Sequence, residues 1–292
     1  MLDCWLMADI HRLLGQRQWK LPLTGAGGGI RVCAQYTSFF GRTSALNVAH
    51  QAAFQKLICN LVTEGVWAKL DVMYVFATNS SGNALLNLVS SSFTATVVGA
   101  PTFAADGGYT GTDAFPAVNY LDTGFNASTA GGNFVLNSAH LSCWSNTNFT
   151  TVNGGSCIGI RGSGTTDWAF IEPHDSSQLL QISTINNAAG TGVTNANSTG
   201  HYLANRTSSA LNSGYKNAAS VQAANLTSGA VANGNMFVLA NNKVGTGPIN
   251  GGAYQIMAAT IGGGLTAGDI TNLCHELNTY LNTIAGVASG AC

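Results

Sequence analysis

Residues 254–286, YQIMAATIGGGLTAGDITNLCHELNTYLNTIAG, contain the signals that decide the fold. The first eight, Tyr254–Ile261, are predicted to form a β-strand that stops at a triple glycine, where β propensity and side-chain packing are both lost. A helix is predicted next, because Thr266 and Asp269 are spaced to cap each other's backbone amides. Apolar residues then recur at three- and four-residue spacing, and Gly286 is placed to end the helix.

Upstream of that stretch, short apolar segments alternate with clusters of glycine, asparagine and serine, which is typical of an antiparallel sandwich. The alternation of strands and helices that marks a parallel α/β fold does not occur. A second amphipathic helix is predicted over Ala45–Glu64, and we expect it to pack beside the C-terminal helix, Ala267–Ala285. The other predicted strands are Val72–Ala77, Phe93–Val98, Ala139–Trp144, Ser156–Arg161, Asp167–Ile171, Gln178–Thr184, His201–Asn205 and Asn235–Ala240.

Several phrases of sequence carry a family resemblance. They are GVWAKLD (65–71), PTFAADGGY (101–109) with YLDTGF (120–125), NSAH (137–140), and NRT (205–207) with YKN (215–217). Together they resemble the concanavalin A-like (laminin-G-like) jelly rolls of tailed-phage virions. The resemblance implies an all-β dominated fold, a concanavalin-like antiparallel β-sandwich (jelly roll) with two flanking α-helices and an N-terminal arm. It further implies a structural protein of the virion surface, as a capsid decoration, a fibre or a tail-associated subunit.

Three segments are expected along the chain. Residues 1–44 are predicted to be an arm with a short helix that serves assembly, residues 45–286 the jelly-roll domain, and residues 287–292 a tail. A segment as short as the arm cannot bury its own large apolar side chains, so we expect it to pack on the domain or on a neighbouring subunit. These side chains are Trp5, Trp19, Phe39 and Phe40.

Charge is scarce in this chain. Only 8% of the residues are charged, against roughly 25% in ordinary soluble domains, and the formal net charge is −1. The 11 lysines and arginines are scattered, which argues against nucleic acid as a partner because phosphate contacts supply most of that affinity. Apolar runs are too short to cross a bilayer, so no membrane is expected. We expect other virion proteins and further copies of this chain as partners.

Candidate glycan contacts are His140, Trp144, Arg206 and Tyr215. His140 and Trp144 are four residues apart on a predicted strand and therefore share one face. A tryptophan there could stack on a sugar ring, although burial in the sandwich core explains it as well. Arg206 follows a predicted strand, and its alternative role is a bidentate link to a carboxylate across the sheet edge.

Acidic residues suggest calcium more readily than catalysis. Asp106 and Asp122 lie in glycine-containing turns and could supply oxygen ligands to Ca²⁺, although turn chemistry alone explains them. No other cofactor is predicted. A glycoside hydrolase needs two facing carboxylates, whereas the nearest cluster puts Glu172 and Asp175 on opposite strand faces with Pro173 between them. We therefore predict that the chain is not an enzyme.

Seven cysteines cannot all pair within one chain. Cys143 and Cys157 could face each other across a hairpin, while Cys4, Cys33 and Cys292 are candidates for disulfides between subunits. The alternative for the cysteines inside the domain is that they pack as small buried thiols. Those cysteines are Cys59, Cys143, Cys157 and Cys274. No pair has the C-x-x-C spacing of a zinc site.

The sequence thus favours a structural virion protein at the particle surface, with host glycans as candidate ligands. A glycan-binding adhesin or lectin is the alternative, and a polysaccharide hydrolase is the weaker one. Both alternatives suit the same fold, which hosts lectins and glycoside hydrolases.

Overall fold

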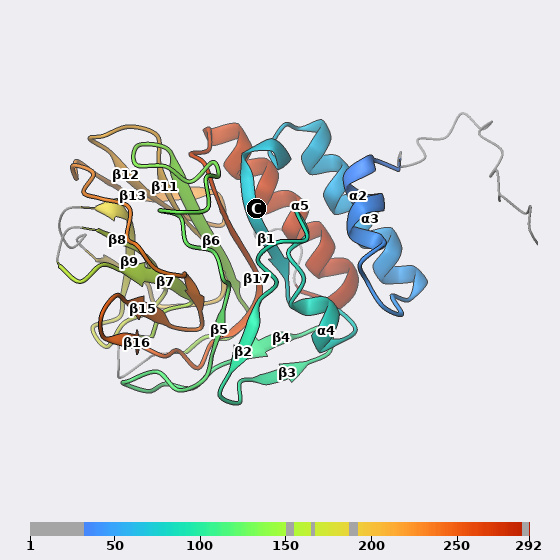
Figure 1. Ribbon diagram of the computed structural model, residues 1–292, viewed down its shortest axis with the longest axis horizontal. Helices are drawn as coiled ribbons and strands as arrows, with labels where there is room; N and C mark the ends of the chain where they lie inside the picture. Colours follow the sequence, from blue (N-terminus) through green and yellow to red (C-terminus); the bar gives the residue numbers. More distant parts are fainter. Residues whose placement is uncertain (1–31, 150–154, 165–166, 187–191, 288–291) are drawn as a thin grey trace, which may run out of the picture. The chain divides into compact units, whose positions relative to one another are not determined.

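Two β-sheets lie face to face, and helices cover the outer face of one of them (Figure 1). The computed structural model describes residues 32–149, 155–164, 167–186, 192–287 and 292. Residues Arg31–Cys292 form one compact unit, and residues 1–30 lie outside the described residues. The predictions for Cys4, Trp5 and Trp19 fall in that part. Among the described helices, none has the length and apolar character needed to span a bilayer.

The sheet that carries the helices is called the helix-side sheet. Its strand order is β13-β12-β11-β6-β17-β4-β3, and β1 also pairs with β17. The strands are β1 Leu70–Val75, β3 Thr102–Ala104, β4 Gly108–Thr110, β6 Ala139–Ser145, β11 Gly200–Arg206, β12 Asn212–Lys216, β13 Ala219–Ala224 and β17 Gln255–Gly262. All of these pairs are antiparallel.

The second sheet has the order β10-β9-β8-β7-β14-β5-β2, again with antiparallel neighbours. A short hairpin of β15 and β16 joins it through a parallel pairing of β15 with β7. The strands are β2 Thr96–Val98, β5 Tyr120–Asp122, β7 Ile158–Arg161, β8 Trp168–Glu172, β9 Leu179–Asn186, β10 Val193–Thr194, β14 Phe237–Val238, β15 Asn241–Lys243 and β16 Gly247–Ile249.

The helices are α2 Ala34–Phe40, α3 Val48–Thr63, α4 Ser81–Ala84 and α5 Ala267–Ala285. Helix α5 has the predicted bounds, with the reciprocal Thr266–Asp269 capping box and a left-handed Gly286 at its end. Helix α3 begins three residues later than predicted, because Asn47 caps it by accepting a hydrogen bond from the His50 amide.

The helices α3 and α5 pack together, as expected. Phe54 of α3 contacts Tyr280 of α5, with ring centroids 4.8 Å apart. Asn60 of α3 also donates to Glu276 of α5 at 3.0 Å. Helix α2 joins this layer through Phe39, which packs on Phe54, so this part of the predicted arm belongs to the compact unit.

Strand alternation separates two cores. On β6, Leu141 and Cys143 face the second sheet and belong to the core between the sheets. Trp144 faces the other way and packs with the helices, as does Leu203 on β11. The chain is therefore a concanavalin-like β-sandwich with a helical layer on one outer face. Strands β3, β4, β5, β10, β12, β13, β15 and β16 were not predicted, since most are two or three residues long and rich in glycine, threonine or asparagine.

Candidate functional site

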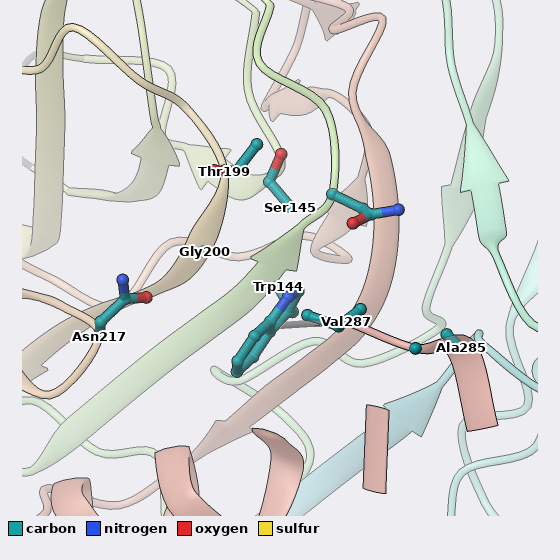
Figure 2. A pocket seen from close by; sticks show the side chains of 9 residues that line it. Trp144, Ser145, Thr199, Gly200, Asn217, Ala285 and Val287 are labelled. Atoms are coloured by element: carbon teal, nitrogen blue, oxygen red, sulfur yellow. The ribbon is translucent and has the colours of Figure 1, made fainter. Parts of the chain in front are cut away.

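A pocket of about 450 Å³ opens at one end of the helix-side sheet, where β6 ends, β11 begins and α5 stops. Figure 2 shows Trp144 between Asn217 on one side and Val287 on the other. The lining residues are Trp144, Ser145, Asn146, Thr199, Gly200, Asn217, Ala285, Gly286 and Val287. We call this the Trp144 pocket.

Backbone turns bring these residues together. Asn217 sits between β12 and β13 with φ +50°, a left-handed conformation that asparagine tolerates better than most residues. Its side-chain oxygen accepts the amide of His201 at 2.8 Å, which fixes the turn against β11. On the other side, Gly286 ends α5 with φ +66° and turns the chain toward Val287.

The pocket walls are uncharged. They present the hydroxyl of Thr199 and the amides of Asn146 and Asn217, whereas Ser145 and the indole of Trp144 are buried. Asn146 donates to the side-chain oxygen of Gln255 at 3.0 Å, so its amide is oriented. Trp144 is 1% exposed and stacks on His201, with ring centroids 5.8 Å apart. Such a surface can exchange hydrogen bonds with a neutral polar ligand, and it has no carboxylate for acid–base chemistry.

Of the four predicted glycan contacts, Trp144 lines the pocket, but its side chain is buried. Tyr215 lies two residues before Asn217, half-buried against the helical layer. His140 shares the face of Trp144, as its spacing indicates, but it is fully buried and donates or accepts only within the protein. The pocket residues Asn146, Thr199 and Asn217 gave no sequence signal, because asparagine and threonine occur throughout the chain.

Arg206 is also wrong as a glycan contact, since its side chain is fully buried. Nor does it have the expected carboxylate partner. Its guanidinium donates to the carbonyl of Thr184 at 2.6 Å and to the side-chain oxygen of Asn186 at 2.6 Å. It also donates to the carbonyls of Ser208 and Leu226 at 3.1 and 3.0 Å.

The two candidate calcium ligands lie in separate turns. Asp106 has φ +60° and bonds to Nε2 of His50 at 2.8 Å. Asp122 accepts the amide of Gly124 at 2.8 Å, as in a tight Asx turn, and a bond from Asn235. Within the described residues, no cluster of three or more histidine, cysteine or acidic side chains has the geometry to hold a metal ion.

The cluster of Glu172 and Asp175 is a buried structural turn. Glu172 is 3% exposed and receives Arg161 at 2.8 Å, Ser156 at 3.0 Å and Asn250 at 2.7 Å on the same carboxylate oxygen. Burial raises the pKa of Glu172, and the nearby Arg161 acts in the opposite direction. Asp175 accepts the amides of Ser177 and Leu179 in the β8–β9 hairpin.

Three disulfides correct most of the cysteine predictions. Cys143 and Cys157 are joined, with Cα atoms 6.5 Å apart, and link β6 to the segment that enters β7. Cys33 pairs with Cys59 and Cys274 pairs with Cys292, so neither Cys33 nor Cys292 is available to a second subunit. The alternative that the domain cysteines are unpaired thiols is likewise wrong. The first of these disulfides joins Cys33, just before α2, to α3, and the second joins the C-terminal tail to α5. The spacing of the cysteines in the sequence did not predict either pairing.

No protein-family model matches the sequence, and no curated protein matches it either. Among solved structures, domain 4 of AbnA, a GH43 extracellular arabinanase from Geobacillus stearothermophilus, has 16% identity and a TM-score of 0.40 over 71% of this chain and 98% of that one. A mutant sialidase of Trypanosoma rangeli has 9% identity and a TM-score of 0.49 over 80% of this chain and 40% of that one.

The binding domain of botulinum neurotoxin DC, solved with rat synaptotagmin II, has 13% identity and a TM-score of 0.44 over 73% of this chain and 52% of that one. This chain therefore spans about half or less of the sialidase and toxin chains. Likenesses at this level concern the β-sandwich fold and bring no activity to this chain.

Proposed function

We propose that this chain is a non-catalytic subunit of an extracellular particle, displayed on the surface of a tailed-phage virion, and that its Trp144 pocket recognises a neutral glycan. The observation that carries the glycan proposal is the pocket lining itself. Asn146, Thr199 and Asn217 are exposed or half-buried and offer two amides and a hydroxyl, and no ionisable side chain is among the lining residues. Sugars offer many hydroxyls and no charge, so this surface matches their chemistry.

Two observations support the extracellular placement. Three disulfides join described residues, and disulfides persist outside the reducing cytosol. The chain also carries few charges, so much of its hydration depends on asparagine, serine and threonine. The virion itself is proposed from the sequence phrases that resemble phage jelly rolls.

Assembly with further subunits is proposed from exposed apolar side chains. Phe115 is 63% exposed and Val118 53% exposed on the connection that leads into β5, and Val97 on the adjacent edge strand β2 is 38% exposed. Apolar residues gathered at a sheet edge are typical of surfaces that are covered in an assembly. Other virion proteins or further copies of this chain are the proposed partners.

The glycan proposal is tested by screening the purified protein on a glycan array and then titrating the best neutral ligand by calorimetry. Asn146→Ala removes one pocket amide, and Asn217→Gly removes another while tolerating the positive φ. Each substitution should weaken binding about fivefold, since one hydrogen bond contributes on the order of 1 kcal/mol. Thr199→Ala should act in the same direction. Thr102→Ala, on the exposed edge strand β3, is the matched control and should leave affinity unchanged.

If the protein binds no saccharide saturably, the second candidate function is a purely structural subunit. The exposed apolar residues favour that candidate. Mass spectrometry of purified particles then tests the virion placement directly. The chain should be present at a fixed copy number per particle. Its absence from particles would overturn the virion proposal without affecting the pocket result.

A further inference from the structure

Lys216 and Asn195 are held in contact at the margin of the sandwich. Lys216 is the last residue of β12 in the helix-side sheet, and Asn195 follows β10 in the second sheet. The ammonium nitrogen Nζ of Lys216 lies 2.8 Å from Oδ1 of Asn195 and 2.5 Å from the carbonyl oxygen of Asn197. It also lies 5.4 Å from the ring centroid of Tyr202. The ion pairs among the described residues do not include Lys216.

The amide of Asn195 has a fixed orientation. Its side chain is 7% exposed, and Nδ2 donates to the carbonyl of Pro173 at 2.5 Å and to the hydroxyl of Tyr202 at 3.0 Å. Oδ1 therefore points to the lysine and Nδ2 points to the phenol.

We propose that Lys216 and Asn195 condense to an isopeptide bond, so that the chain carries a covalent cross-link between its two sheets besides its disulfides. Lys216 first loses one proton to water. The free amine Nζ then attacks Cγ of Asn195, and the electron pair of the carbonyl moves to Oδ1. When that pair returns, the Cγ–Nδ2 bond breaks, Nδ2 takes a proton from the Tyr202 hydroxyl and leaves as ammonia, and the phenolate regains a proton from Nζ. The balance is one amine plus one carboxamide giving one amide plus ammonia, so no oxidant or activating cofactor is needed.

The surroundings of both reacting groups favour this direction. Burial lowers the pKa of Lys216, which increases the fraction of free amine. Burial also raises the pKa of Tyr202, so the phenol keeps its proton. The hydroxyl donates that proton to the carbonyl of Asn197 at 2.9 Å and has to rotate toward Nδ2 to protonate the leaving nitrogen. The contact does not involve the Trp144 pocket, and the inference is independent of glycan binding.

The test is the intact mass of the purified full chain after its disulfides have been reduced and alkylated. We expect a mass below that of the sequence by one ammonia. Trypsin should then fail to cut after Lys216, and tandem mass spectrometry should find residues 162–206 joined to residues 207–243 in one branched peptide. The full sequence mass together with complete cleavage after Lys216 would overturn the proposal.

Two variants separate this reaction from other losses of ammonia. Lys216→Arg keeps a cation over Tyr202 but cannot form the amide, so it should have the full mass. Asn153-Gly154, Asn233-Gly234 and Asn250-Gly251 can also lose ammonia by cyclising. A loss that persists in Lys216→Arg would assign it to them and contradict our inference. Tyr202→Phe keeps the ring and removes the proton donor, and should slow cross-linking of freshly synthesised protein about 100-fold.

Discussion

Nη2 of Arg206 donates to the side-chain oxygen of Asn186 at 2.6 Å, and this bond joins the last residue of β11 to the last residue of β9. The two strands belong to different sheets. The same guanidinium binds three backbone carbonyls, and a buried charge is tolerated when its donors are satisfied in this way. Arg206 therefore holds the two sheets together at this end of the sandwich and is a structural residue.

Arg206→Met should lower the free energy of unfolding by roughly 3–5 kcal/mol, because it leaves several buried oxygens without donors. Urea denaturation followed by tryptophan fluorescence measures this. The matched control is Arg42→Met, since Arg42 also donates to backbone carbonyls, those of Leu88 and Ser90, but is partly exposed. Water can replace its bonds, so its cost should be about 1 kcal/mol. Equal losses in the two variants would show that burial of Arg206 is not the decisive factor.

Local signals in the sequence were sufficient for the helix α5 and for the longer strands. The capping pair Thr266 and Asp269 and the terminal Gly286 act within a few residues of the helix they bound, so their spacing can be interpreted without a fold. The same holds for β6, because alternation of Leu141 and Cys143 with Trp144 follows from strand geometry alone.

Contacts between distant segments could not be predicted in this way. The partners of Arg206 lie on three separate segments, and two of the three disulfides return a terminal segment to a helix. The pocket residues Asn146, Thr199 and Asn217 meet only because β6, β11 and β12 are neighbours in the sheet. Their residue types are common throughout the chain, so composition could not single them out.

Leu277→Asp should destabilise the protein by roughly 3–5 kcal/mol. Leu277 is 1% exposed and belongs to the core that α3 and α5 form with the helix-side sheet, so the substitution buries an unpaired carboxylate. Thr271→Asp adds the same charge to an exposed position of α5 and should change stability by less than about 0.5 kcal/mol. Thermal and urea denaturation of both variants measure this difference. Equal stability of Leu277→Asp and Thr271→Asp would mean that α5 does not pack firmly against the helix-side sheet.

Six of the seven cysteines are paired in the structure, which leaves Cys4. Alkylation of the denatured, unreduced chain should therefore label at most one thiol. Replacing both Cys143 and Cys157 by alanine should cost about 3 kcal/mol, because this cross-link closes a loop of 14 residues in the unfolded chain. Labelling of Cys33 or Cys292 in freshly purified protein would contradict the pairing seen here.

Polysaccharides should release no reducing ends when incubated with this protein. The pocket lining contains no carboxylate. Glu172 is buried and accepts hydrogen bonds from Arg161, Ser156 and Asn250. The measurement is a reducing-sugar assay over a panel of neutral and acidic polysaccharides. Turnover that Glu172→Gln abolishes, while the variant still unfolds cooperatively, would identify this residue as an acid catalyst and refute the prediction.

Acid should destabilise the helical layer, because two histidines are buried beneath it. Nδ1 of His140 donates to the carbonyl of Gly263 at 2.6 Å, and His201 stacks on Trp144. Lys69 and Asp269 are the charged groups that act on His140. Burial lowers the pKa of His140 to about 4 and that of His201 to about 3, against an ordinary 6.5.

A lowered pKa means that the unfolded chain binds protons that the folded chain does not, so unfolding becomes easier as the pH falls. The stability contributed by the neutral histidines is complete above pH 6.5 and is lost as the pH falls toward about 4, by up to about 1.4 kcal/mol per pH unit for each histidine. Buried carboxyls such as Asp71 and Glu172, whose pKa burial raises, act in the opposite direction. The prediction is therefore made for a difference between variants.

His201→Phe keeps an aromatic ring beside Trp144 and removes one titrating group. Urea midpoints measured between pH 7 and pH 4.5 should fall less steeply for this variant than for the parent protein. His275→Gln removes a histidine from the exposed surface of α5 and should leave the steepness unchanged. If the parent, His201→Phe and His275→Gln lose stability in parallel as the pH falls, His201 is not responsible for the acid sensitivity. A shallower pH dependence of stability for His201→Phe alone assigns the acid sensitivity to protonation of His201, which would put a charge into the core between the helix-side sheet and α5.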